Sequence, residues 1–247
     1  MPTTTLEDES MAPSFPVLGL PVHVLSDYGS WVFQRLGQEI GTHIVTLNAE
    51  MAMQAEQNQP LADVIHQADL VIPDGSGVVL YLRFKKQQVQ RCPGIELAEA
   101  LIPQVAQRYG PESLCFYGAK PGITQQAAER LLSTGGESVK TFHGYLKPEE
   151  QQPLFRHLEA IQPKLILVGL GVPRQEFWIA QNRHLCPNSI WVGVGGSFDI
   201  WAGTKERAPA WFCDNHLEWL YRLYQEPWRW RRMLALPQFA WKALMSG

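Results

Sequence analysis

Asp74, at the end of a short apolar segment, is the residue of this sequence whose position most clearly suggests a chemical role. Residues 70–72 predict a buried strand, and Pro73 ends it because proline cannot donate a hydrogen bond to a sheet ladder. Asp74 follows, and Gly75 and Gly77 allow a tight turn beside it. A carboxylate at the carboxyl end of a strand can take a proton from a substrate as a general base. The same residues are also typical of an Asx turn or a helix N-cap.

A second predicted strand, residues 43–47, ends in further polar side chains. Thr46 and Asn48 are two positions apart in an extended segment, so both side chains can point to the same side. If the two strands are neighbours in a sheet, Thr46, Asn48 and Asp74 lie at one rim. Asn48 could instead cap the helix that follows it.

Glycine-containing loops follow several predicted strands. Residues 118–122 join a strand to a helix N-terminus, which offers backbone N–H groups to an anion, and Lys120 adds a positive charge. This loop is not a Walker loop, because the Gly-Lys-Ser/Thr ending is absent. Loops after two later strands each resemble half of a dinucleotide fingerprint. Arg174 and Phe198 stand where its final glycine belongs, so we do not expect NAD.

Strands and helices alternate along most of the chain. This pattern predicts an α/β fold with a doubly wound, mainly parallel, Rossmann-like sheet and a C-terminal helical appendage. We expect residues 1–17 to be a disordered extension, residues 18–203 to form the core and residues 204–247 to form the appendage. The expected strands are residues 17–25, 43–47, 70–72, 113–117, 139–143, 165–168 and 190–194.

The composition describes a globular protein, with 45% hydrophobic and 18% charged residues. No apolar run reaches the roughly 18 residues that span a bilayer, and the acidic N-terminus is unlike a signal peptide. The four cysteines have neither zinc-ligand nor thioredoxin spacing. We therefore expect reduced thiols and a cytoplasmic protein.

The core and the appendage carry opposite charge. Residues 204–247 contain seven Lys or Arg and four Asp or Glu, whereas the rest of the chain contains 14 basic and 20 acidic residues. Six of the nine tryptophans lie between Trp201 and the C-terminus. A basic, tryptophan-rich segment suggests a phosphate-bearing partner or a membrane surface. The alternative is a helical cap packed by aromatic side chains, with its arginines merely solvated.

Two helices are expected in the appendage, over residues 211–224 and 228–242, with a proline between them. Arg222, Arg229 and Arg232 lie 7 and 10 residues apart, which is the spacing of one helix face. These guanidinium groups match phosphate oxygens in shape and charge.

An ordered series of short motifs extends from about residue 18 to about residue 232. The motifs are Thr46-x-Asn48, Pro73-Asp74-Gly75, Arg91-x-Pro93-Gly94, Gly118-x-Lys120-Pro121-Gly122, Gly144-Tyr145, Gly169-Leu170-Gly171-x-Pro173-Arg174-Gln175-Glu176, Gly193-Val194-Gly195-x-x-Phe198-Asp199, Ala202-Gly203, Arg207-Ala208-Pro209 and Leu217-Glu218-Trp219-Leu220-Tyr221-Arg222-Leu223. Through this series the chain resembles the WecG/TagA/CpsF family of bacterial glycosyltransferases.

The resemblance implies a UDP-sugar-dependent hexosyltransferase that inverts the anomeric centre and uses no metal or other cofactor. It implies that N-acetylmannosamine passes from a UDP-sugar donor to N-acetylglucosamine on a polyprenyl diphosphate, in the biosynthesis of cell-surface polysaccharide. The enzyme would be peripheral on the inner face of the cell membrane, held by the appendage, with no nucleic-acid partner. The sequence has no Asp-x-Asp motif, so arginines are expected to offset the charge of the departing diphosphate.

The resemblance also carries residue assignments. The expected catalytic residues are Asp74, Arg222, Arg229 and Arg232. The expected substrate-binding residues are Thr46, Asn48, Arg91, Gly118, Lys120, Tyr145, Gly171 and Gln175. Glu96, Ala119 and Leu146 depart from residues that are common in the family, which leaves the donor sugar open, including a UDP-glucose or UDP-glucuronate type of donor.

A second class of function also stays open. The chain could be a catalytically silent, nucleotide-sugar-binding scaffold at the membrane. Assembly into a homo-oligomer is open as well.

Overall fold

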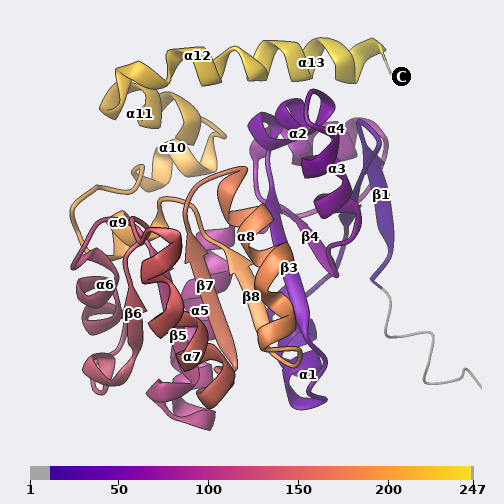
Figure 1. Ribbon diagram of the computed structural model, residues 1–247. Helices are drawn as coiled ribbons and strands as arrows, with labels where there is room; N and C mark the ends of the chain where they lie inside the picture. Colours follow the sequence, from indigo (N-terminus) through magenta and orange to yellow (C-terminus); the bar gives the residue numbers. More distant parts are fainter. Residues whose placement is uncertain (1–11, 246–247) are drawn as a thin grey trace, which may run out of the picture.

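The computed structural model describes residues 12–245, except for the side chains of Asp214 and Arg229. The main sheet contains β3 (Thr42–Leu47), β4 (Leu70–Pro73), β5 (Leu114–Gly118), β6 (Lys140–Phe142), β7 (Leu165–Gly169) and β8 (Ile190–Gly193). The strand order is β4-β3-β8-β7-β5-β6, and every neighbouring pair is parallel. The predicted α/β fold is confirmed, and all six carboxyl ends meet at one edge of the sheet (Figure 1).

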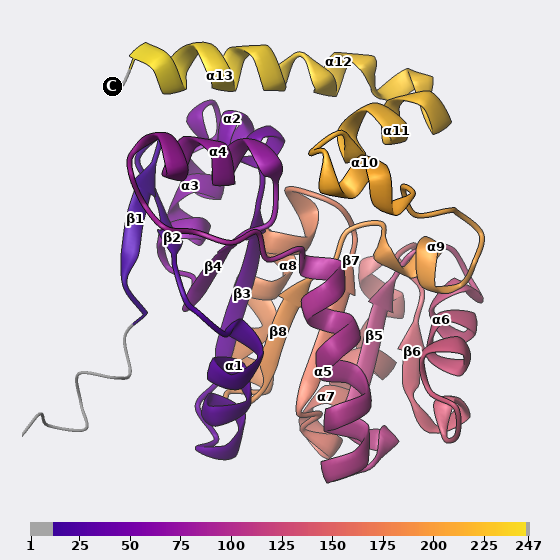
Figure 2. The same ribbon diagram turned by 180° about the vertical axis from the view of Figure 1, so that it is seen from behind.

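Both faces of the sheet are buried, because successive strand residues point to opposite sides. In β3, Ile44 belongs to the apolar cluster on one face and Val45 to the cluster on the other. The first face is covered by α1 (Tyr28–Gly37), α5 (Gly94–Tyr109) and α6 (Ile123–Leu131), which are in front in Figure 2. The second face is covered by α3 (Gln59–His66), α7 (Gln152–Ile161) and α8 (Arg174–Asn182).

Three more helices begin directly at strand ends. They are α2 (Ala49–Glu56), α4 (Ser76–Phe84) and α9 (Ser197–Trp201), which follow β3, β4 and β8. Short 3₁₀ turns occur at η1 (Pro111–Ser113), η2 (Gly136–Ser138), η3 (Pro148–Glu150) and η4 (Arg183–Leu185).

The N-terminal segment differs from the predicted strand over residues 17–25. It forms an antiparallel hairpin of β1 (Ser14–Val17) and β2 (Leu20–His23), outside the main sheet. The reason is the turn between them, where Leu18 and Gly19 both have positive φ, the geometry of a two-residue hairpin. The disorder expected over residues 1–17 is therefore wrong for β1, and residues 1–11 lie outside the described part.

The appendage forms more helices than the two predicted. Its elements are α10 (Ala210–Asp214), α11 (Glu218–Gln225), η5 (Pro227–Arg229), α12 (Trp230–Met233) and α13 (Ala235–Met245). The single helix expected over residues 211–224 is wrong, because the chain turns between α10 and α11, where His216 has a φ of 62°.

The appendage lies over the carboxyl edge of the sheet, with α13 running above α2 and α4 and α12 above α11 (Figures 1 and 2). Phe239 of α13 is buried, with its ring edge-on to Tyr81 of α4. Lys242 adds an ion pair to Glu56 of α2, with an N–O distance of 2.6 Å. Within the described residues, none of the helices is long and apolar enough to cross a membrane.

Candidate active site

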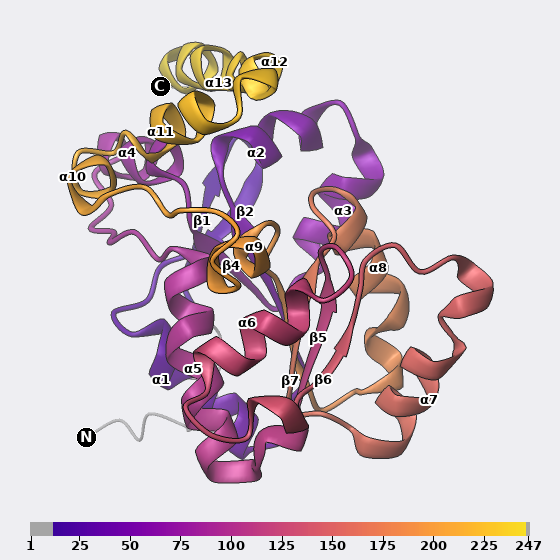
Figure 3. The same cartoon turned by 90° about the vertical axis from the view of Figure 1, so that its left-hand side faces the viewer.

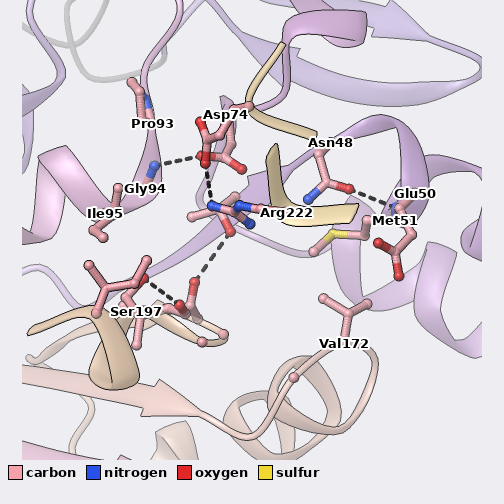
Figure 4. Close-up of a pocket in the computed structure, with 18 of the residues that line it drawn as sticks. Asn48, Glu50, Met51, Asp74, Pro93, Gly94, Ile95, Val172, Ser197 and Arg222 are labelled. Carbon is pink, nitrogen blue, oxygen red and sulfur yellow. Dashed lines mark hydrogen bonds and ion pairs between the residues drawn. The ribbon is translucent and has the colours of Figure 1, made fainter. Parts of the chain in front are cut away.

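A cavity of about 410 Å³ lies at the carboxyl ends of β3, β4, β7 and β8. The appendage supplies part of its wall, from α11 to α12, so the cavity is bounded by both parts of the chain (Figure 4). The predicted site residues in this wall are Thr46, Asn48, Asp74, Arg91, Gly171, Gln175, Arg222 and Arg232.

Asp74 follows β4 and is held from two directions. Its Oδ1 accepts a hydrogen bond from the backbone N–H of Gly94 at 2.8 Å, and its backbone carbonyl accepts one from Arg91 Nε at 2.6 Å. Burial raises the pKa of the Asp74 carboxyl group above its usual value and outweighs the Gly94 hydrogen bond and the charges of Arg91 and Arg222, which lower it. A carboxylate with a raised pKa is a stronger base than an ordinary aspartate.

The end of β3 forms the next part of the wall. Thr46 Oγ1 donates to the Gly193 carbonyl at 3.3 Å. Asn48 Oδ1 accepts from Met51 N–H at 3.0 Å and caps α2, so Asn48 both caps a helix and lines the cavity. The loop before α5 lies tightly against this strand, since a Cβ on Gly94 would be 2.4 Å from Thr46 Cγ2. Glycine in the Arg91-x-Pro93-Gly94 motif therefore allows this close approach.

Gln175 connects the two glycine loops that follow β7 and β8. Its Oε1 accepts from the N–H groups of Gly171 at 3.2 Å and Gly195 at 3.0 Å. Its Nε2 donates to Glu176 Oε1 at 2.9 Å. With both ends of its amide in use, Gln175 fixes the shape of the loops at the cavity.

Glu176 and His43 form a buried pair behind Gln175 that sequence reasoning missed. Their side chains are almost fully buried, and His43 Nε2 lies 3.4 Å from Glu176 Oε2. Glu176 belongs to a recognised motif, but nothing local in the sequence indicates that β3 places a histidine beside it.

Glu218 is a second residue that the sequence analysis did not assign. Its Oε2 accepts from Arg91 Nη2 at 2.6 Å, and its Oε1 pairs with Arg222 Nη2, so one carboxylate joins two arginines. Burial acts to raise the pKa of Glu218, but Arg222 and Arg91 together lower it below its usual value. The four-residue spacing to Arg222 was the available signal, because it places both side chains on one helix face.

The three appendage arginines have different positions. Arg222 lies near Asp74 in the cavity (Figure 4). Arg232 lines the cavity from α12, and its Nη1 is 3.7 Å from Glu50 Oε1. The prediction for Arg229 concerns a side chain outside the described part of the structure.

Three predicted substrate-binding residues lie elsewhere on the same edge of the sheet. Gly118 is the last residue of β5, where a Cβ would be 2.4 Å from the Gly169 carbonyl oxygen. Lys120 and Tyr145 are exposed and, like Gly118, do not belong to the wall of the cavity. Their contact with a nucleotide remains a prediction.

The described part of the chain contains no group of three or more His, Cys, Asp or Glu side chains arranged to hold a metal ion. The charged groups of the cavity include the Asp74 carboxyl group, whose pKa is raised, and two arginines, Arg91 and Arg222, that Glu218 links.

A parallel sheet with a carboxylate of raised pKa and clustered arginines at its ligand-binding edge is suited to an enzyme that binds a ligand with phosphate groups. The model of the glycosyl transferase WecG/TagA/CpsF family matches residues 15–247. The chain belongs to this family and is a glycosyltransferase.

Two curated relatives cover most of the chain. A protein of Bacillus spizizenii strain W23 is 38% identical over 207 residues, which are 83% of this chain and 79% of the relative. A protein of Bacillus subtilis strain 168 is 32% identical over 209 residues, which are 83% of this chain and 80% of the relative. Both relatives are named N-acetylglucosaminyldiphosphoundecaprenol N-acetyl-beta-D-mannosaminyltransferase.

Proposed function

We propose that this enzyme transfers N-acetylmannosamine from its UDP derivative to N-acetylglucosamine on a polyprenyl diphosphate, with inversion, in cell-surface polysaccharide biosynthesis. The names of both relatives support this choice of acceptor and sugar. The observation that carries the proposal is the cavity in which Asp74 lies near two arginines, Arg91 and Arg222, that Glu218 joins.

The roles follow from the charges of these groups. The Asp74 carboxylate takes the proton of the acceptor hydroxyl group as its oxygen bonds to the anomeric carbon. The bond from that carbon to the diphosphate breaks, and its electron pair leaves with UDP. Arg222 and Arg232 stabilise the negative charge that develops on the leaving diphosphate. Gln175 holds the glycine loops after β7 and β8 in position, so that their backbone would face the donor.

The direct test is to incubate the full chain with UDP-N-acetylmannosamine and a lipid-diphosphate-linked N-acetylglucosamine. Mass spectrometry should show one added N-acetylhexosamine, with release of one UDP. UDP-glucose, UDP-glucuronate and UDP-N-acetylglucosamine in parallel reactions identify the donor. Donor binding without transfer to any acceptor would support the scaffold instead.

We predict that turnover is unchanged after metals are removed with EDTA. The arginines of the cavity supply the positive charge that a metal ion provides in enzymes with an Asp-x-Asp motif. Initial rates with and without EDTA, and with Mg²⁺ or Mn²⁺ added back, measure this. A rate that disappears in EDTA and returns with one metal would contradict the metal-independent mechanism.

We further propose that the appendage attaches the enzyme to the inner face of the cell membrane. It exposes large apolar side chains, and aromatic rings are favoured at a bilayer interface. The exposed members are Trp211, Trp219, Leu220, Tyr224, Trp228, Trp230, Leu234, Trp241, Leu244 and Met245. Figure 3 shows the helices of the appendage together at one end of the molecule.

Replacing both Trp230 and Trp241 by serine should weaken binding to anionic liposomes by roughly tenfold or more, because two interfacial aromatic anchors are lost. Liposome flotation measures the bound fraction. Ile161→Ser is the matched control, because Ile161 is a half-exposed apolar residue on α7, away from the appendage. Equal binding by the double variant and the control would remove the appendage from this role.

A further inference from the structure

A second cavity, apolar and of about 580 Å³, lies beside the first. It forms a groove between α2 and α4 of the core and the helices α11 to α13 of the appendage, and we call it the apolar groove. The polar side chains in its wall are limited, over the described residues, to Ser76, Tyr81, His216 and Trp219. Its wall carries no charged side chain among those residues, so it suits an uncharged hydrophobic ligand.

The apolar groove shares its walls with the catalytic cavity. Adjacent residues of one element line the two spaces, as with Glu218 and Trp219 in α11 or Arg232 and Met233 in α12. Neighbouring helix positions point in different directions, so a single helix can present charge to one space and apolar surface to the other. A ligand with a phosphate head in the cavity thus meets apolar surface next to it.

The groove is also open to solvent. Leu80 is 52% exposed, Phe84 60% and Leu244 66%, although all three line it. Apolar surface of this kind gains free energy when a hydrophobic ligand covers it. Phe239 closes the floor and stays buried.

We propose that the apolar groove binds the first isoprene units of the polyprenyl acceptor, next to its diphosphate. This rests on the proposed function, because that acceptor joins an anionic diphosphate directly to a long apolar chain. With the acceptor's diphosphate in the catalytic cavity beside the groove, the prenyl chain passes between α4 and the appendage and continues towards the membrane. The groove therefore selects acceptors by their lipid, separately from the sugar chemistry.

The test compares two acceptors with the same N-acetylglucosaminyl diphosphate head, one on a farnesyl chain and one on a propyl chain. Both are used as monomers in solution, so membrane attachment does not contribute. The full-length enzyme should show a much higher kcat/KM with the farnesyl acceptor, since each buried methylene contributes roughly fourfold.

The variant Leu80→Gln with Phe84→Gln makes the groove polar without adding charge. It should lower kcat/KM for the farnesyl acceptor by about tenfold or more, through KM, and leave the propyl acceptor unchanged. Both positions are exposed, which favours normal folding, and Ile161→Gln is the control for an exposed apolar residue elsewhere. An equal loss with both acceptors, or no loss with either, would overturn the proposal.

Failure of the proposed function can be distinguished from failure of the groove as a lipid-binding site. If the unmodified enzyme transfers no sugar to either acceptor, the proposed function fails. The groove is then tested by calorimetric binding of farnesyl diphosphate against propyl diphosphate. Tighter binding of farnesyl diphosphate that is lost in the Leu80/Phe84 variant supports the groove, and equal binding of the two compounds refutes it.

Discussion

Asp74→Asn is expected to lower kcat by roughly 10²–10⁴-fold, because the amide cannot take the proton of the acceptor hydroxyl group. Donor binding should be retained, since an Asn side chain can still accept the Gly94 hydrogen bond through its oxygen. Steady-state rates and calorimetric titration with the donor separate the two effects. Asp63→Asn, an exposed change on α3, is the control. Near-normal turnover in Asp74→Asn would exclude Asp74 as the base.

The raised pKa of Asp74 leads to two further expectations, one for the pH dependence of activity and one for the pH dependence of stability. Activity should fall as the pH drops through that pKa, because the base must be ionised, so the acidic limb of kcat/KM lies above that of an ordinary aspartate. A carboxyl group whose pKa is raised by folding stabilises the folded state at low pH and loses this contribution as pH rises through the raised pKa. Above that pH the charged Asp74 disfavours folding, so Asp74→Asn should unfold at an equal or higher temperature than the unmodified enzyme.

Arg222→Ala is expected to lower kcat by roughly 10²–10³-fold, the usual effect of removing one group that stabilises transition-state charge. Arg222 lies in the cavity near Asp74, and its loss also leaves Glu218 with Arg91 alone. Arg222→Lys should recover only part of the rate, because an ammonium group lacks the planar fork of a guanidinium.

The matched control for Arg222 is Arg231→Ala. Arg231 belongs to the same appendage, but its guanidinium lies 5.4 Å from the Trp230 ring and it does not line the cavity. Rates measured at saturating donor and acceptor should therefore change in Arg222→Ala and not in Arg231→Ala. If both variants keep the full rate, the leaving diphosphate must be stabilised by other cations, such as Arg232 or Lys120.

The parallel sheet could be predicted because four of its strands, β4, β5, β7 and β8, are short apolar runs that end in glycine or proline. The same reasoning explains why one rim collects Thr46, Asn48, Asp74 and Gln175, since parallel strands end at a common edge. The hairpin of β1 and β2 was missed because the Leu18-Gly19 turn lies within an apolar stretch that looks continuous.

Other features depend on contacts between distant segments. The pairing of His43 with Glu176 depends on how α8 packs against β3, and neither residue has a local signal for it. Glu218 has a local partner in Arg222, but its contact with Arg91 spans 127 residues. The apolar groove likewise exists only where α13 lies over α2 and α4, so no pattern within one segment predicts it.

The ion pairs beneath the appendage differ in their access to water, which has a consequence for ionic strength. Arg232–Glu50 and Lys242–Glu56 involve half-exposed cations, whereas the side chains of Arg91 and Glu218 are 17% and 9% exposed. Screening acts mainly on exposed charges, with a Debye length that shrinks from about 10 Å at 0.1 M salt to about 3 Å at 1 M. Concentrated salt should thus loosen α12 and α13 first and leave α11 tied to Arg91. The groove for the lipid would then lose its α12 and α13 wall, whereas the catalytic cavity would lose Arg232 and keep Arg91, Glu218 and Arg222. Salt would therefore reduce acceptor use more than donor binding.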